Sequence, residues 1–226
     1  MSISPPAPGS ALVVVVDPAR VGEKMTACLS AAEREQAERF RFEKDALHWR
    51  ACRAALRVVL GQALGIPPEA VGFEFGEFGK PALSPASREL HFNLSHCRDL
   101  ALIALCRDGA VGVDIEPADR SASLLGCEDA FCHPAELAEL PTDETLRAAM
   151  LMEIWTKKES LLKALGTGFS LPAQSVSVTD PPLSYAGDSR FRELRLHCLA
   201  HTTLAKHFAW LAAPASINGI EILHWA

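Results

Sequence analysis

The chain has 226 residues, of which 49% are hydrophobic and 22% are charged. A chain of this length and apolar content can bury a sizeable core, as one large domain or two small ones, which excludes a disordered protein. The formal net charge is −6, and no Lys- and Arg-rich run is interleaved with aromatic residues, which argues against a nucleic-acid-binding protein. Any basic site must therefore be local.

The beginning of the sequence and the cysteines indicate the compartment. Residues 1–10 are rich in Pro and Ser without a positive charge, and the apolar run from Ala11 to Val16 is far shorter than a membrane-spanning helix. Seven cysteines are an odd number in a chain without paired C-x-x-C units, so we expect free thiols rather than disulfides or zinc ligands. We therefore expect a cytoplasmic protein that does not act at a membrane.

Two helices are predicted after a buried strand at 11–16. Ser30, with Glu33 three residues later, forms a capping box that opens a polar helix to about residue 39. Asp45 is expected to cap a second helix, which ends near Gly65. The apolar stripe of that helix should face the core, and its members are Leu47, Cys52, Leu56, Val59, Leu60 and Leu64. Its other face carries a basic ridge, for which a solvated surface is the default interpretation: His48, Arg50, Arg53 and Arg57.

Short strands and turns follow the second helix. Residues 71–75 alternate as a strand does, and the Gly- and Pro-containing loop at 76–81 can present Lys80 rigidly, although such a lysine is more often merely exposed. Residues 91–96 predict a strand whose end delivers Ser95 and His96 to a loop. Further strands are predicted at 101–106 and 111–116.

Two acidic residues alternate with apolar ones in the strand at 111–116. Asp114 and Glu116 point to one face of this strand, and Val113 and Ile115 point to the other. Strands tolerate Asp poorly, so the pair calls for a compensating partner, of which a Mg²⁺ ion is the simplest. The alternative, which this segment alone supports equally, is a strand that surfaces at its end before Pro117.

The second half predicts short helices, one long helix and several strands. A helix is expected at 129–140, and a long helix opens at Thr142 and Asp143 and ends at Gly166 and Gly168. Strands are expected at 175–178, 194–199, 208–212 and 219–224.

The end of the long helix carries an aromatic ring, a carboxylate and an ammonium group at helical spacing. Trp155, Glu159 and Lys163 are four residues apart, so they line roughly one face. That face offers a metal ligand or base beside a phosphate-binding cation. The plainer interpretation is an exposed Glu-to-Lys pair.

The order of elements indicates an α+β fold made of two similar α/β lobes. We expect an N-terminal lobe at 1–109 and a C-terminal lobe at 110–226. Sequence similarity between the halves is weak, so the duplication is inferred from the element order.

Four segments stand in order along the chain and together resemble one family. They are Gly79-Lys80-Pro81, Phe92-Asn93-Leu94-Ser95-His96, Gly112-Val113-Asp114-Ile115-Glu116 and Trp155 to Gly168. This combination resembles the 4′-phosphopantetheinyl transferases, specifically the monomeric two-lobed surfactin type. The pair G-V-D-I-E and W-T-x-K-E-x-x-x-K-x-x-G-x-G is specific at this separation, whereas either alone is a weak signal. A looser likeness covers residues 39–42 and 45–57.

The resemblance implies transfer of the phosphopantetheine arm of coenzyme A to a serine of an apo acyl or peptidyl carrier protein, leaving adenosine 3′,5′-bisphosphate. It further implies that Asp114, Glu116 and Glu159 hold Mg²⁺, with Mn²⁺ as an alternative, against the pyrophosphate. Lys163 and His96 would contact phosphate oxygens. Ser95, Lys80 and Pro81 would lie near the nucleotide. The two-lobed likeness further implies that the active site lies between the lobes, and a monomer is expected from it.

The first lobe departs from the family in its basic residues. The positions expected to bind the 3′-phosphate include Glu33 and Gln36 here, so His48, Arg50 and Arg53 are taken as substitutes. Lys157 and Lys158 are interpreted as solvated helix residues or as a rim for an acidic carrier, and Trp155 as a core residue.

The chemistry of the residues agrees with the implied reaction. Cleavage of a pyrophosphate by a serine hydroxyl needs charge neutralisation and a proton acceptor, for which Glu159 is the best candidate. Ser95 as a hydrolase nucleophile would need an acid-oriented base and a G-x-S-x-G elbow, and neither is present. Two alternatives stay open: a Mg²⁺-dependent nucleotide pyrophosphohydrolase and a non-catalytic coenzyme A-binding protein.

Overall fold

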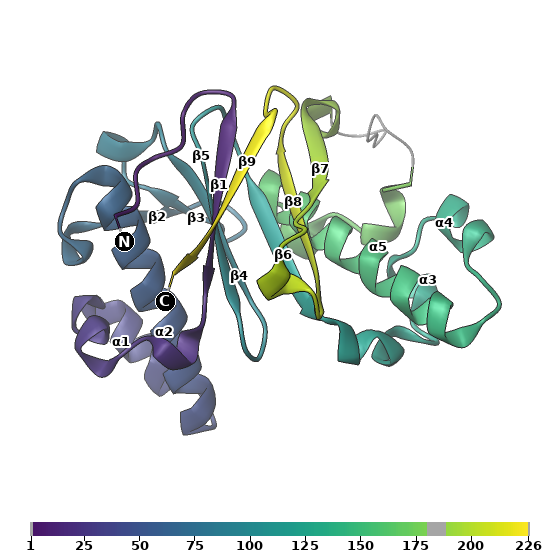
Figure 1. Ribbon diagram of the computed structural model, residues 1–226, viewed down its shortest axis with the longest axis horizontal. Coiled ribbons are helices and arrows are strands. Elements are labelled where there is room, and N and C mark those ends of the chain that lie inside the picture. Colours follow the sequence, from purple (N-terminus) through teal and green to yellow (C-terminus); the bar gives the residue numbers. More distant parts are fainter. Residues whose placement is uncertain (1, 180–188, 226) are drawn as a thin grey trace.

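The computed structural model describes residues 2–179 and 189–225. In this part of the chain, a four-stranded sheet and a three-stranded sheet each pack against one long helix, and the two units lie next to each other (Figure 1). This arrangement confirms the predicted α+β class and its two lobes.

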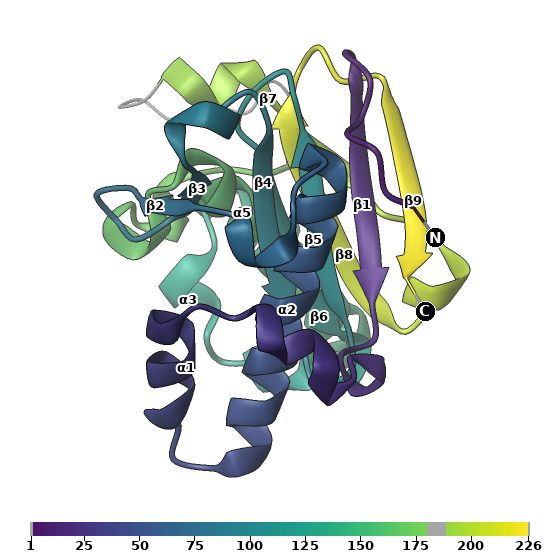
Figure 2. The same ribbon diagram turned by 90° about the vertical axis from the view of Figure 1, so that its left-hand side faces the viewer.

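The first lobe is built on the four-stranded sheet, whose strand order is β4, β5, β1 and β9. Its elements are β1 (Ser10–Val16), α1 (Ala31–Glu38), α2 (Glu43–Leu64), β2 (Phe73–Phe75), β3 (Pro81–Leu83), β4 (His91–His96), β5 (Ala101–Cys106) and β9 (Gly219–Trp225). Strand β1 pairs antiparallel with β5 and parallel with β9, which lies beside it in Figure 2. The last strand of the chain therefore completes the sheet of the first lobe.

Helix α2 covers one face of this sheet. Leu56, Val59 and Leu60 are fully buried and pack against apolar side chains of β1 and β5. The helix ends at Gly65, which takes the left-handed conformation (φ 68°) that glycine adopts without strain. The predicted cap at Asp45 is wrong because the helix begins at Glu43. Asp45 lies in the first turn instead, where its negative charge interacts favourably with the positive end of the helix dipole.

The second lobe is built on the three-stranded sheet, in the order β6, β8 and β7. Its elements are β6 (Gly112–Pro117), α3 (Glu128–Phe131), α4 (Pro134–Glu139), α5 (Glu144–Leu165), β7 (Leu194–Cys198) and β8 (His207–Pro214). Helix α5 packs against β6 and β8. Its predicted limits are confirmed, since Asp143 caps its start and Gly166 (φ 72°) ends it.

Two predicted elements of the second lobe are wrong. The single helix expected at 129–140 is divided, because Pro134 opens a new helix that His133 caps. The strand expected at 175–178 is a 3₁₀ turn at Ala173–Ser175 followed by irregular chain. Val176 and Val178 are nevertheless buried, so their apolar character reflects burial without strand pairing.

Both faces of the first sheet are covered. Along β1, Leu12, Val14 and Val16 face α2, while Val13 and Val15 face a core that they share with β6 and β8. A strand buried on both faces has an unbroken apolar sequence, which accounts for the valine run. The two lobes are therefore packed together through a common core.

The predicted division at 109/110 falls in the connection between β5 and β6. Strand β9 departs from it, because it follows the second lobe in sequence but lies in the first sheet. For the remainder of each lobe the division stays a prediction.

Two general expectations can be compared with the described residues. All seven cysteines are free thiols in the structure. Among residues 2–179 and 189–225, no helix has the length and apolar character needed to cross a membrane.

Helix α5 approaches β6 most closely at Gly112. A Cβ atom added to Gly112 would overlap the backbone oxygen of Ser160 and the backbone nitrogen of Ala164. Because both atoms belong to the backbone of the C-terminal part of α5, neither can move aside without moving the helix. Glycine is thus required for the helix to lie directly on the strand.

We expect Gly112→Ala to destabilise the protein by about 3 kcal/mol or more, the upper range of overpacking effects. The measurement is the midpoint of urea unfolding, compared between variants whose unfolding free energy has the same dependence on urea concentration. The matched control is Gly22→Ala, since an added Cβ at Gly22 meets no atom within 4 Å. Equal unfolding midpoints for the two variants would contradict the close approach of α5 and β6.

Candidate active site

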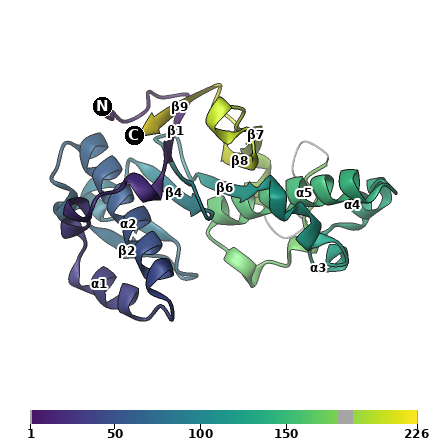
Figure 3. The same ribbon diagram turned by 60° about the horizontal axis from the view of Figure 1, so that its bottom comes forward.

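Polar side chains from three elements meet where the two lobes join. Strand β4 contributes Ser95 and His96, β6 contributes Asp114, and α5 contributes Lys163. Figure 3 shows β4 and β6 next to each other between the two long helices. Strands β4 and β6 are further linked through Asn93, whose Oδ1 accepts a hydrogen bond from the backbone nitrogen of Val113 at 2.9 Å.

Asp114 is the most buried carboxylate of this site. Its side chain oxygen Oδ1 accepts hydrogen bonds from Ser95 Oγ at 2.8 Å and from Lys163 Nζ at 2.5 Å. Its other oxygen, Oδ2, is buried without a partner. A buried carboxylate oxygen without a hydrogen bond is costly, so this atom is suited to a cation.

Lys163 links the strand residues to the helix. Its Nζ donates to Ser95 Oγ at 2.9 Å as well as to Asp114. About 29% of its side chain is exposed, so the ammonium group is within reach of a ligand. The lysine can therefore neutralise Asp114 and also contact an incoming anion.

The other two acidic residues, Glu116 and Glu159, have raised pKa values because they are buried near other carboxylates. Burial raises the pKa of Glu159 to about 7, Lys163 lowers it, and the carboxylates of Asp114 and Glu116 raise it further. Burial and Asp114 also raise the pKa of Glu116, against the opposing charges of Arg120 and Lys163. Both carboxyl groups thus lie in a region where an additional cation would be stabilised.

The carboxylate oxygens of these three acidic residues are the ligand type that a hard divalent cation prefers. Among the described residues, Asp114, Glu116 and Glu159 do not form a cluster in which all ligand atoms lie within 4.8 Å of one another. Mg²⁺ binds through one or two carboxylates and keeps several waters and substrate oxygens, so a fully closed protein cage is not required. The unpartnered Oδ2 of Asp114 and the two raised pKa values support this fit.

His96 lies beside this site and against His48 of α2. The centroids of the two rings are 5.1 Å apart. Burial of the ring, followed by the nearby His48 and Lys163, lowers the pKa of His96 to about 4, with Asp114 opposing the shift. The residue as a whole remains exposed, so a ligand can reach a neutral imidazole.

The predicted basic ridge on α2 is mostly paired with acidic groups. Arg53 donates to Glu33 Oε1 at 2.8 Å, and Arg50 lies 3.2 Å from Glu43. The solvated interpretation is wrong for Arg57, which is 4% exposed and donates to Glu33 Oε2 at 2.6 Å. The acidic Glu33 thus holds two arginines of this helix.

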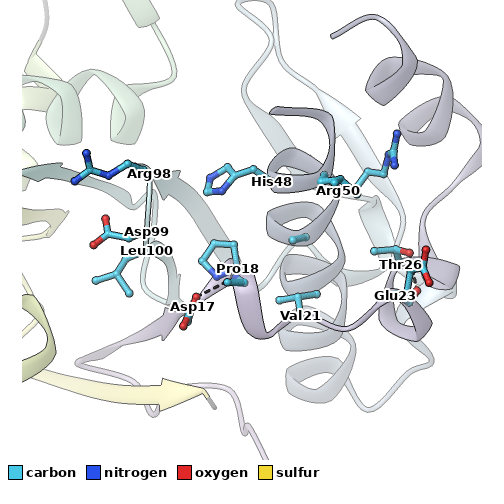
Figure 4. A pocket seen from close by; sticks show the side chains of 13 residues that line it. Asp17, Pro18, Val21, Glu23, Thr26, His48, Arg50, Arg98, Asp99 and Leu100 are labelled. Atoms are coloured by element: carbon cyan, nitrogen blue, oxygen red, sulfur yellow. Dashed lines mark hydrogen bonds between the residues drawn. The ribbon is translucent and has the colours of Figure 1, made fainter. Parts of the chain in front are cut away.

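The predicted coenzyme A residues are divided between two cavities. One cavity of about 840 Å³ is lined by Arg53, Pro81 and His96, among others. His48 and Arg50 line a second cavity of about 700 Å³ on another side of α2, which Figure 4 shows together with Arg98. The structure therefore does not bring His48, Arg50 and Arg53 around one common space.

Lys80 has a different environment from the predicted one. Its ammonium group donates to the backbone oxygens of Val111 at 3.1 Å and Ala164 at 2.8 Å. Burial lowers its pKa to about 8. These interactions make Lys80 a link from the β2–β3 hairpin to β6 and α5, and its ammonium group does not line the cavity beside His96.

The two lysines before Glu159 also differ from each other. Lys157 pairs with Glu153 at 2.6 Å and lies over the ring of Trp210. The solvated interpretation is wrong for Lys158, which is 1% exposed, pairs with the buried Glu136 at 2.6 Å and donates to two backbone carbonyls.

The sequence carries a signal for the buried lysine that the motif obscured. Lys158 follows Leu151 and Ile154 and precedes Leu161 and Leu162 at helical spacing, so it lies on the apolar face of α5. Glu136, its partner, is 22 residues away and could not be assigned to it from spacing. The expectation for Trp155 is better matched, since its ring packs against Phe131 at the edge of the apolar core of the second lobe, formed around α5.

Comparisons with known proteins are consistent with this geometry. Residues 110–209 match the model of the 4′-phosphopantetheinyl transferase superfamily, and residues 20–107 match that of the 4′-phosphopantetheinyl transferase N-terminal region. The two matched segments correspond to the bodies of the two lobes.

Several curated proteins are similar to this chain. The 4′-phosphopantetheinyl transferase psf-1 of Bacillus pumilus is 31% identical over 89% of this chain and 86% of its own length, and that of Bacillus subtilis is 32% identical over 69% and 68%. HetI of a Nostoc species is 35% identical over 66% of this chain, and the match spans 64% of that protein. The chain belongs to the 4′-phosphopantetheinyl transferase family.

Proposed function

We propose that this protein transfers the 4′-phosphopantetheine group of coenzyme A to a serine of an apo acyl or peptidyl carrier protein, with release of adenosine 3′,5′-bisphosphate. The observation that supports it most is the site around Asp114, where an unpartnered buried carboxylate oxygen, a lysine and an acid of raised pKa lie together. Membership of the family supports the same reaction.

Asp114, Glu116 and Glu159 would hold Mg²⁺, with Mn²⁺ as an alternative. When bound, the cation supplies positive charge to the pyrophosphate oxygens of coenzyme A. The ammonium group of Lys163 would contact the same phosphate oxygens as a second positive charge. In this arrangement Lys163 exchanges its contact with Asp114 for a contact with the substrate.

Glu159 is the proposed proton acceptor. The serine hydroxyl of the carrier loses its proton to Glu159 as its oxygen attacks the β-phosphorus, and the bond from this phosphorus to the bridging oxygen breaks. A pKa of about 7 suits a base that works near neutral pH. His96, which is neutral there, would donate a ring N–H to a phosphate oxygen.

The cavity beside His96 is the proposed location of the nucleotide part of coenzyme A. It is lined by Phe73 and Pro81, which offer apolar surface, and by Arg53, which offers a positive charge. Because one chain supplies all the proposed residues, we expect the monomer to be active. A cytoplasmic location stays a prediction.

The transfer reaction is tested by intact mass measurement of several apo carrier proteins after incubation with coenzyme A, Mg²⁺ and this protein. We expect a mass increase equal to one phosphopantetheine group on the carrier. Coenzyme A cleavage without a carrier would instead support a pyrophosphohydrolase. Binding without cleavage or transfer on every carrier would support a coenzyme A-binding protein, and both results would contradict the proposal.

We expect Glu159→Gln to lower kcat for transfer by about 10²- to 10⁴-fold, the usual contribution of a general base. Coenzyme A affinity, measured by calorimetry, should change only a few-fold, because Lys163 and the nucleotide cavity are retained. The control is Glu153→Gln, on the same helix, which removes an ion pair with Lys157. Unchanged turnover in Glu159→Gln would exclude this residue as the base.

The raised pKa of Glu159 also has a consequence for stability. In the metal-free protein the folded state keeps this proton to about pH 7, whereas the unfolded state loses it near the ordinary value of 4.5. The free energy of unfolding therefore decreases as pH rises between these values. Relative to Glu159→Gln, the free energy of unfolding of the native protein should fall by on the order of 3 kcal/mol over this range, since the pKa rises from 4.5 to about 7 and one pKa unit corresponds to about 1.4 kcal/mol.

The measurement is chemical unfolding of both proteins in a chelator from pH 4.5 to 8. The difference between the two curves should grow up to about pH 7 and then stay constant. Addition of Mg²⁺ should stabilise the native protein more than the variant, because the cation favours the ionised carboxylate. Parallel curves at all pH values would contradict the raised pKa.

A further inference from the structure

Three side chains that bind transition metals meet next to the proposed active site. His48 and Cys52 are four residues apart on α2 and therefore lie on one face of the helix, and His96 reaches them from the end of β4. One ligand atom from each of the three lies within 4.8 Å of the other two. The carboxylates of the proposed magnesium site are not part of this cluster.

The spacing of two of these atoms fits a common metal ion. Cys52 Sγ and His48 Nε2 are 3.6 Å apart. A tetrahedral zinc ion with bonds of about 2.3 Å to sulfur and about 2.0 to 2.1 Å to nitrogen holds the two ligand atoms about 3.6 Å from each other. The rings of His48 and His96 meet at an interplanar angle of 69°, so they are not stacked and their nitrogens can approach a shared point.

The surroundings provide a fixed ligand and an open side. Cys52 is fully buried in the core of the first lobe, so its sulfur is held in place. His48 is partly buried and His96 is exposed. Figure 4 shows His48 extending from α2 into the cavity on the side of Arg98, whereas Arg50 extends from the opposite side of the helix. A metal ion can therefore enter from the side of the two imidazoles.

We propose that His48, Cys52 and His96 form a binding site for zinc, with three protein ligands and a fourth position open to water. One thiolate and two imidazoles are ligands that zinc prefers, whereas Mg²⁺ prefers oxygen. On binding, the Cys52 thiol loses its proton to solvent and the sulfur forms a bond to the metal. Burial raises the pKa of this thiol to about 12, so the metal must displace a proton that the free protein retains.

The site shares His96 with the proposed active site. An imidazole that is bound to zinc is held toward α2 and its ligand nitrogen no longer contacts phosphate. Zinc should therefore inhibit phosphopantetheine transfer, a consequence that rests on the proposed function. Metal binding itself does not depend on that function, so the two can fail separately.

Binding is tested on the full-length, reduced and metal-free protein with Co²⁺ as a spectroscopic probe. We expect one equivalent of Co²⁺ to give a thiolate-to-cobalt charge-transfer band and the visible absorption of a tetrahedral ion, and zinc to displace it. Cys52→Ala should lose the charge-transfer band and at least about tenfold in zinc affinity, since even changes around a metal ligand have effects of this size. His48→Gln, which keeps the buried sulfur, should weaken binding as well.

Two control variants identify the thiol. Cys106→Ala removes another fully buried cysteine, in β5, and should leave the spectrum unchanged. Cys97→Ala tests a second cluster of possible ligands, which Cys97 forms with Asp99 and His207. Loss of the band in Cys97→Ala with retention in Cys52→Ala, or no thiolate band in the native protein, would overturn the proposal and leave only a thiol–imidazole hydrogen bond at Cys52.

The functional consequence is tested by zinc inhibition of transfer in excess Mg²⁺. Native protein should be inhibited, whereas Cys52→Ala should be active without zinc and need at least about tenfold more zinc for the same inhibition. Equal inhibition of both proteins would place the inhibitory zinc at the carboxylates and overturn the consequence. If no transfer occurs even without zinc, the proposed function fails, and the cobalt spectrum still decides the metal site.

Discussion

The close packing of α5 on β6 is the constraint on which the rest of this site depends. At Gly112 the helix backbone lies so near the strand that a single added carbon would overlap it. This contact sets the position of the helix relative to the strand, and so it determines that Lys163 reaches Asp114 and Ser95. A side chain at the glycine position would move the helix outward and separate these groups. The glycine of the motif is therefore needed for geometry as much as the acids are for chemistry.

Electrostatics then explains why the site is suited to a cation and a phosphate. Asp114 is held by one hydroxyl and one ammonium group and keeps one oxygen without a partner. Glu159 has a raised pKa because it is buried and close to other carboxylates. A positive ion would lower the energy of both groups, and a phosphate would be attracted to that ion and to Lys163. Burial and charge thus favour the same ligands.

His96 joins two sites of different chemical preference. On one side are oxygen ligands suited to a hard cation, and on the other are Cys52 and His48, which suit zinc. The residue is exposed, so its ring is accessible from solvent. A histidine that is shared in this way would allow a metal to control access of the substrate phosphate to the site.

Local patterns in the sequence were sufficient to predict most helices and strands and the shared face of Asp114 and Glu116 on β6, because strand alternation and helix capping involve only neighbouring residues. They were also sufficient to predict that α5 carries Glu159 and Lys163. Pairings between distant residues could not be inferred, because burial of a charge depends on which partner the fold brings to it. Lys158 and Lys80 were therefore misjudged, since their carbonyl and carboxylate partners lie on other elements. For the same reason, only the tertiary structure decided the place of β9 beside β1 and the meeting of His96 with Cys52.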